Sequence, residues 1–173
     1  VLLTDEIPVL LIHHPANRDH DHPSGSLAGL RYCLEAGAQV VEVDINPLRD
    51  GDFALLHDSE LEHTTDGVGS VSSFTADQVR SLRYKHRGAF TSEHVGLLSE
   101  ALVLIQGYDD FQELQLDLKA GPGLTNASLA GLLRMLEPVK DRVRVTSGAD
   151  WTLRCLRALD ADLPIGFDPL FYL

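Results

Sequence analysis

The strongest constraint on the fold is a stretch at residues 40–58, in which two carboxylates interrupt a run of β-branched residues. Because side chains alternate between the two faces of a strand, Glu42 and Asp44 point to the same face. The apolar residues around them point to the opposite face, which other elements must cover. An Asp-Gly pair then predicts a turn, and a second strand over 53–57 ends at His57. Carboxylates that face the interior of a sheet are costly unless they are paired or hold a cation.

The rest of the chain alternates between short apolar runs and amphipathic segments, which predict strands and helices respectively. The predicted strands cover residues 8–13, 40–45, 53–57, 113–119, 143–146 and 164–167. The predicted helices cover residues 24–36, 75–82, 99–106, 126–136 and 150–159. Between them, residues 59–74 form a long predicted loop, and residues 83–95 are charged and irregular. Strands that alternate with helices imply right-handed βαβ units and a parallel sheet.

Ionisable residues stand at the carboxyl ends of successive predicted strands. This placement is typical of a (β/α) barrel, whose site lies at the C-terminal face of the strands. Three carboxylates suit Mg²⁺ or Ca²⁺, because both cations prefer oxygen ligands. Two histidines suit acid and base roles near neutral pH, and a lysine suits a phosphate oxygen. The group consists of His13, Glu42, Asp44, His57, Asp117 and Lys119.

The composition limits the kinds of partner. The 173 residues carry a formal net charge of -12, which argues against nucleic acid or an anionic membrane surface as the main partner. No apolar run is long enough to span a membrane. Cys33 and Cys155 fall in predicted helices without metal-type spacing, which favours two reduced thiols and a cytoplasmic protein. We therefore expect a single domain over residues 1–173 that acts on a small molecule.

The chain resembles the glycerophosphodiester phosphodiesterase family, which belongs to the phospholipase-C-like group of TIM-barrel proteins. The matching motifs occur in the same order over most of the chain. The residues that carry the resemblance are His13, Glu42, Asp44, Asp50, Gly51, His57, Asp58, Leu61, Thr64, Thr65, Gly67, Asp117, Lys119 and Ser147. The resemblance implies an α/β fold, a TIM barrel with about six βα units in this chain and its C-terminal strands missing.

The same resemblance implies a chemistry. Members of the family cleave glycerophosphodiesters into an alcohol and glycerol phosphate with the help of a divalent cation, Mg²⁺ or Ca²⁺. By this likeness His13 and His57 are the catalytic acid and base. The residues that match the family's metal ligands are Glu42, Asp44 and Asp117. Lys119 binds the substrate phosphate, together with His14, which stands where the family has a phosphate-binding arginine.

Several departures from the family pattern leave other functions open. His14 and Pro15 replace an Arg-Gly pair, and Ser24 replaces a glutamate. His63 replaces another arginine, and Asp117 stands where the family usually has the longer glutamate. One alternative is a degenerate relative that binds a phosphorylated ligand or a partner without turnover. Another is a different metal-assisted hydrolase on a related barrel.

The number of predicted strands bears on assembly. Six strands are fewer than the eight of a closed barrel. A sheet that does not close presents two edges, and open edges invite pairing with another chain. We therefore expect either that the natural chain continues past Leu173 or that a homo-oligomer covers the open edges.

Overall fold

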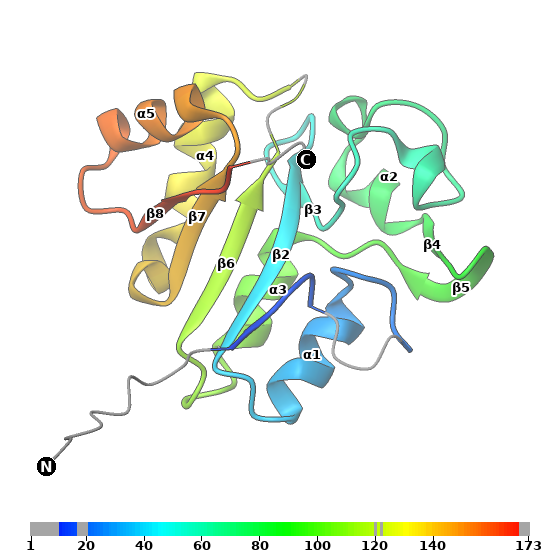
Figure 1. The fold of residues 1–173 in the computed structure, drawn as a ribbon. Coiled ribbons are helices and arrows are strands. Elements are labelled where there is room, and N and C mark those ends of the chain that lie inside the picture. Colours follow the sequence, from blue (N-terminus) through cyan, green and yellow to red (C-terminus); the bar gives the residue numbers. More distant parts are fainter. Residues whose placement is uncertain (1–10, 17–20, 120, 122, 170–173) are drawn as a thin grey trace, which may run out of the picture.

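A parallel sheet forms the centre of the fold (Figure 1). The computed structural model describes residues 11–16, 21–119, 121 and 123–169. Five strands lie in the order β1-β2-β6-β7-β8, and each is parallel to its neighbours. They are β1 (Ile12–His13), β2 (Val40–Pro47), β6 (Glu113–Leu118), β7 (Val143–Ser147) and β8 (Ile165–Phe167). Parallel neighbours in chain order are the connection pattern of a TIM barrel, so the predicted α/β barrel class is confirmed.

The sixth strand of the sheet runs in the opposite direction. β3 (Phe53–Ala54) pairs antiparallel with the end of β2. The predicted turn lies between them, and Gly51 has a φ of 99°, which favours glycine. A tight turn returns the chain antiparallel, whereas a parallel neighbour needs a long crossover. The strand predicted over residues 53–57 is shorter than expected, since β3 ends at Ala54. His57 lies in the loop that follows β3.

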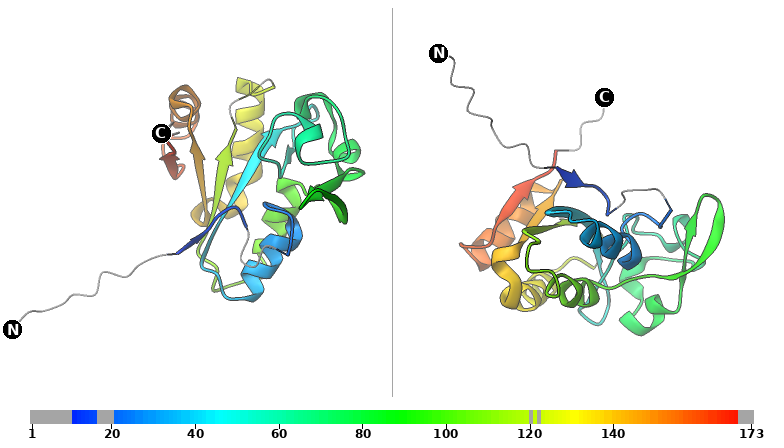
Figure 2. Two further views of the ribbon diagram at one scale, coloured as in Figure 1. Left: turned by 45° about the vertical axis from the view of Figure 1, so that its right-hand side comes forward. Right: turned by 90° about the horizontal axis from the view of Figure 1, so that it is seen from below.

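Four helices pack against one face of the sheet (Figures 1 and 2). They are α1 (Leu27–Glu35), α3 (Leu98–Ile105), α4 (Asn126–Leu136) and α5 (Asp150–Leu159). On that face the core includes Val41, Val43 and Ile45 of β2, none of which has any exposed surface. The alternation of the strand leaves Glu42 and Asp44 on the opposite, inner face, as predicted.

Side chains cap the helices where the sequence predicts their starts. Ser26 accepts a hydrogen bond from the backbone N–H of Gly29 at the start of α1, at 3.1 Å. Thr75 and Gln78 form a capping box at the start of α2 (Ala76–Arg80), within the helix predicted over residues 75–82. Each such cap contributes about 1 kcal/mol.

The segment predicted to be irregular contains a hairpin. β4 (Arg83–His86) and β5 (Ala89–His94) pair antiparallel around Arg87 and Gly88. These two turn residues have φ values of 51° and 81°, as expected for a two-residue hairpin turn that follows the twist of its strands. The exposed residues of both strands are mostly charged or polar, so no apolar alternation marks them in the sequence.

A second hydrophobic cluster lies beneath the hairpin and the loop before it. It is separate from the main core and consists of Leu48, Ala54, Leu56, Leu61, Val71, Val79, Tyr84, Val95 and Leu97. Tyr84 is buried, and its hydroxyl donates a hydrogen bond of 2.7 Å to the carbonyl of Leu55. The hairpin is thereby fixed to the strand end that leads into the His57 loop. Within the described ranges, no helix combines the length and apolar character that a membrane span requires.

Candidate active site

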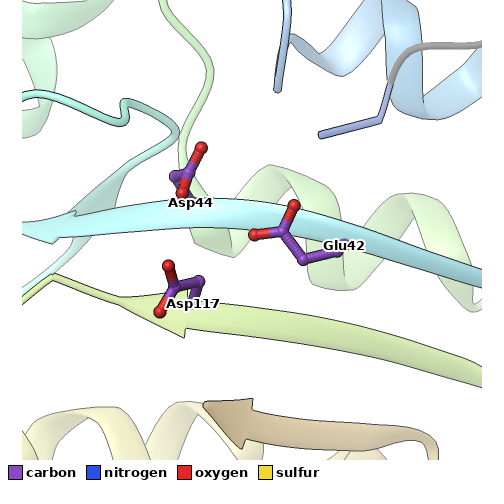
Figure 3. Close-up of side chains that lie close together, drawn as sticks. All are labelled: Glu42, Asp44 and Asp117. Atoms are coloured by element: carbon purple, nitrogen blue, oxygen red, sulfur yellow. The ribbon is translucent and has the colours of Figure 1, made fainter. Parts of the chain in front are cut away.

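Three carboxylates meet on the inner face of the sheet (Figure 3). Glu42 and Asp44 come from β2 and Asp117 from β6, and the parallel register places Asp44 directly beside Asp117. One oxygen of each carboxylate lies within 4.8 Å of the others. All three residues are buried, with exposed fractions of 5%, 4% and 8%. The structure thus brings together the three residues predicted as metal ligands.

Glu42 is the least satisfied member of this group. Burial, followed by repulsion from Asp44 and Asp117, raises its pKa to about 9, although Lys119 opposes the shift. Neither of its carboxylate oxygens accepts a hydrogen bond from a described residue. A divalent cation would neutralise the carboxylates and coordinate these oxygens. The residues present therefore fit a hard cation such as Mg²⁺ or Ca²⁺.

Lys119 partly neutralises the same cluster. Its Nζ lies 2.7 Å from Asp44 Oδ1 and 2.5 Å from Asp117 Oδ2. Burial lowers the pKa of this ammonium, but its hydrogen bonds to the two carboxylates raise it above the ordinary value. Lys119 therefore stays charged at neutral pH. A positive charge beside the carboxylates is suited to a phosphate oxygen, which is the predicted role of this residue.

His57 lies at the mouth of the site. Its Nδ1 is 2.9 Å from Asp58 Oδ1, and its side chain is 66% exposed. A carboxylate on one ring nitrogen orients the ring and leaves the other nitrogen for a reacting group. His63 Nδ1 lies 3.8 Å from the second oxygen of Asp58. Asp58 thus connects two histidines, of which His57 is the one predicted to be catalytic.

The two histidines at the end of β1 occupy different places. His14 Nε2 lies 3.3 Å from Glu42 Oε2, so His14 is at the acidic cluster. His13 is half-buried, and its backbone is in register with Val41, whose side chain belongs to the helix-facing core. Among the residues that the structure describes, the His13 side chain has no hydrogen-bond partner. The assignment of His13 as a catalytic residue stays a prediction.

Asn46 is a site residue that the sequence analysis did not single out. It follows Glu42 and Asp44 at the same spacing of two, so it shares their face of β2. Its buried Nδ2 donates to the carbonyl of Leu56 at 2.7 Å and to that of His57 at 3.3 Å. Asn46 therefore holds the backbone of the His57 loop against the strand that carries the carboxylates. The same period that identifies the carboxylates could have identified it.

Two cavities meet at His57 and Asp58. The larger has a volume of about 570 Å³, and its polar lining includes Asn46, Asp117, Lys119, Ser147 and Asp168. The smaller, of about 340 Å³, has a lining that includes His14, Asp44, Lys85, His86 and Arg87. Because Asp44 lines one cavity and Asp117 the other, the acidic cluster lies between them. A ligand bound at the cluster has room on both sides.

Comparison with known proteins agrees with this arrangement. Residues 18–167 match the Glycerophosphoryl diester phosphodiesterase family. A glycerophosphodiester phosphodiesterase from Caldanaerobacter subterraneus subsp. tengcongensis is 28% identical over 148 residues, which are 83% of this chain and 60% of the relative. Glycerophosphodiester phosphodiesterase 1 of Mus musculus is 38% identical over 87 residues, which are 48% of this chain and 26% of the relative.

A solved structure shares the fold. The phosphodiesterase of Oleispira antarctica, in complex with the product sn-glycerol-3-phosphate, is 26% identical and has a TM-score of 0.78. The match covers 90% of this chain and 64% of that chain. The present chain thus spans about 60% of the length of its curated bacterial relative. A family match over most of the chain, together with this fold, shows that the chain belongs to the glycerophosphoryl diester phosphodiesterase family.

Proposed function

We propose that the protein hydrolyses glycerophosphodiesters to an alcohol and glycerol phosphate, with a divalent cation held by Glu42, Asp44 and Asp117. The observation that carries this proposal is the buried group of three carboxylates, in which Glu42 accepts no hydrogen bond from a described residue and has His14 Nε2 nearby, at 3.3 Å. The bacterial relative and the Oleispira structure are both named as phosphodiesterases, which supports the same reaction class. The bound cation would stabilise negative charge on the phosphoryl oxygens.

In the proposed reaction, two histidines transfer protons, and two other residues bind the substrate. His57, oriented by Asp58, exchanges a proton with one of the two reacting oxygens, and His13 serves the other. One histidine removes a proton from the attacking water as its oxygen bonds to phosphorus, and the other protonates the alcohol that leaves, so that water and the phosphodiester give an alcohol and glycerol phosphate. Lys119 and His14 bind the phosphoryl oxygens. Lys119 is well placed for this role because it already lies against two of the three carboxylates.

The proposed setting is a single cytoplasmic domain that acts on a small molecule and not on nucleic acid. Cys33 is buried and Cys155 half-buried, and neither takes part in a disulfide, which supports a reducing compartment. The net charge of -12 disfavours polyanionic partners. We also propose that a second copy of the chain covers the exposed edges of the sheet.

The direct test is hydrolysis of glycerophosphocholine, and separately of bis(p-nitrophenyl) phosphate, in EDTA and after addition of Mg²⁺ or Ca²⁺. We expect turnover that depends on the cation and is lost in Glu42→Gln. The matched control is Glu35→Gln, an exposed carboxylate on α1, which should keep wild-type activity. Turnover that survives in EDTA would contradict the role of the cation.

A second candidate is a binding protein without turnover, favoured by His14 and Pro15 in place of the family's Arg-Gly pair. It predicts a different result in the same experiment. No substrate would be hydrolysed with either cation, while calorimetry would still detect the binding of glycerol phosphate.

A further inference from the structure

The tip of the β4–β5 hairpin brings positive charge to the smaller cavity. Lys85, His86 and Arg87 are consecutive, and all three line this cavity together with Asp44 and His57. Lys85 and Arg87 are exposed, so their charges are available to a ligand. In a chain with a net charge of -12, this places positive charge next to the proposed reaction centre.

The structure holds this basic segment in place. The backbone N–H of Lys85 donates to the carbonyl of Thr64 at 2.7 Å, and Lys85 Nζ donates to the carbonyl of Glu62 at 3.2 Å. An ammonium has three donors, so two remain for a ligand. The buried Tyr84 fixes the adjacent position of β4 through its bond to Leu55. A binding group whose position is already fixed loses less entropy when the ligand arrives.

The two cavities differ in the chemistry that they offer. The larger one presents the hydroxyl of Ser59 and the carboxylate of Asp168, which suit the hydroxyl groups of a polyol. The smaller one presents an ammonium and a guanidinium, which suit anionic oxygens. A phosphodiester has two ester arms. With its phosphorus at the acidic cluster, one arm extends into each cavity.

We propose that Lys85 and Arg87 bind an anionic group on the alcohol arm of the substrate, with the glycerol arm in the larger cavity. The preferred substrates are then glycerophosphodiesters whose alcohol carries a second phosphate or a carboxylate. This inference rests on the proposed function, since it takes the phosphodiester to be bound at the acidic cluster.

The kinetic test compares bis(glycerophospho)glycerol, whose alcohol arm carries a second phosphodiester, with glycerophosphocholine, whose arm is cationic. We expect wild type to prefer the first substrate. In Lys85→Gln/Arg87→Gln, kcat/KM for bis(glycerophospho)glycerol should fall by about tenfold or more, mainly through KM, because charge-assisted hydrogen bonds are lost. The value for glycerophosphocholine should stay within about twofold, a change of less than 0.5 kcal/mol.

Arg31→Gln is the matched control, because it removes one exposed positive charge on α1 and lines neither of these cavities. It should leave both substrates unaffected. An equal loss for both substrates in the hairpin variant would overturn the inference, because it would place the hairpin charges on the reacting phosphate. The inference would also be wrong if wild type turned over the two substrates equally well and the hairpin variant did the same.

A binding measurement separates this inference from the proposed function. Bis(glycerophospho)glycerol is titrated by calorimetry, with Mg²⁺ present, into His57→Ala and into the same protein with the two hairpin substitutions. Weaker binding in the second protein supports the hairpin site even if wild type shows no turnover, in which case only the proposed function fails. Equal affinities, with turnover intact in wild type, refute the hairpin site and leave the proposed function standing.

Discussion

At the scale of single residues, Glu42 determines how the site responds to pH. In the folded, metal-free protein its pKa is about 9, whereas its ordinary value is 4.5. Between these values the folded state holds a proton that the unfolded state has lost. Stability therefore falls as pH rises through this window. Glu42→Gln, which cannot ionise, should make the protein more stable than wild type at pH 8 in EDTA, as measured by urea unfolding.

The difference in stability between Glu42→Gln and wild type should change with pH. It should shrink as pH falls toward 4.5, the ordinary pKa of Glu42, because the unfolded state then begins to take up the proton that the folded state already holds. Glu35→Gln, at an exposed position, should change stability little at either pH. An advantage of Glu42→Gln that is the same at pH 5 and pH 8 would show that ionisation of Glu42 is not its cause.

Cation binding should make wild type more stable than Glu42→Gln, which is the reverse of the order expected in EDTA. A ligand that binds only the folded state stabilises it by mass action. Mg²⁺ or Ca²⁺ at pH 8 should therefore raise the Tm of wild type, and most of that rise should be absent in Glu42→Gln. Differential scanning calorimetry over a series of cation concentrations measures both effects. A Tm of wild type that does not respond to either cation would contradict the proposed site.

His57 carries the prediction for catalysis. Removing a general acid or base lowers kcat by about two to four orders of magnitude, so His57→Ala should lose activity in this range. His94→Ala removes another exposed histidine, on β5, and should keep wild-type kcat. Steady-state kinetics on glycerophosphocholine provide the measurement. If His57→Ala turned over within tenfold of wild type, His57 would not be the acid or base.

Single residues also show which parts of the site could be predicted from the sequence and which could not. A spacing of two was enough to place Glu42 and Asp44 on one face of β2, and the predicted third carboxylate, Asp117, lies beside Asp44 in the register of β2 with β6. Asn46 has the same spacing, but its role depends on the path of the His57 loop, which no local pattern encodes. The difference between His13 and His14 likewise depends on the register of β1 with β2.

At the scale of secondary-structure elements, the strands of the β4–β5 hairpin could not be predicted from the hydrophobic pattern of the sequence. Its strands lie over the smaller hydrophobic cluster and bury little of their own surface apart from Tyr84. A strand without an apolar face gives no alternating signal. The direction of β3, in contrast, follows from the tight turn before it, and the sequence contained that turn.

Tyr84 is the residue that tests the attachment of this hairpin. Tyr84→Phe leaves the buried carbonyl of Leu55 without its 2.7 Å hydrogen bond. The loss of a buried partner costs about 1–3 kcal/mol, so we expect a drop of this size in the free energy of unfolding, measured with urea. Tyr32→Phe, at a residue that is 37% exposed on α1, should change it by less than about 0.5 kcal/mol. Equal effects of the two substitutions would contradict the anchoring role.

At the scale of the whole molecule, the described strands form an open sheet with β1 and β8 at its edges. Exposed strand edges pair readily with other chains. We expect the 173-residue chain to self-associate in a concentration-dependent way, and light scattering over a dilution series measures this. A monodisperse monomer at every concentration would contradict coverage of the edges by a second copy.

The separate hydrophobic cluster beneath the hairpin has a consequence for the history of this protein. The carboxylates depend on the register of β2 and β6, whereas the hairpin tip depends on packing around Tyr84. Substitutions at the tip are therefore expected to leave the register that positions the carboxylates unchanged. For the proposed substrate preference, this separation would allow the anionic group that is bound to change through substitutions at the tip, one at a time, while the three carboxylates keep their positions.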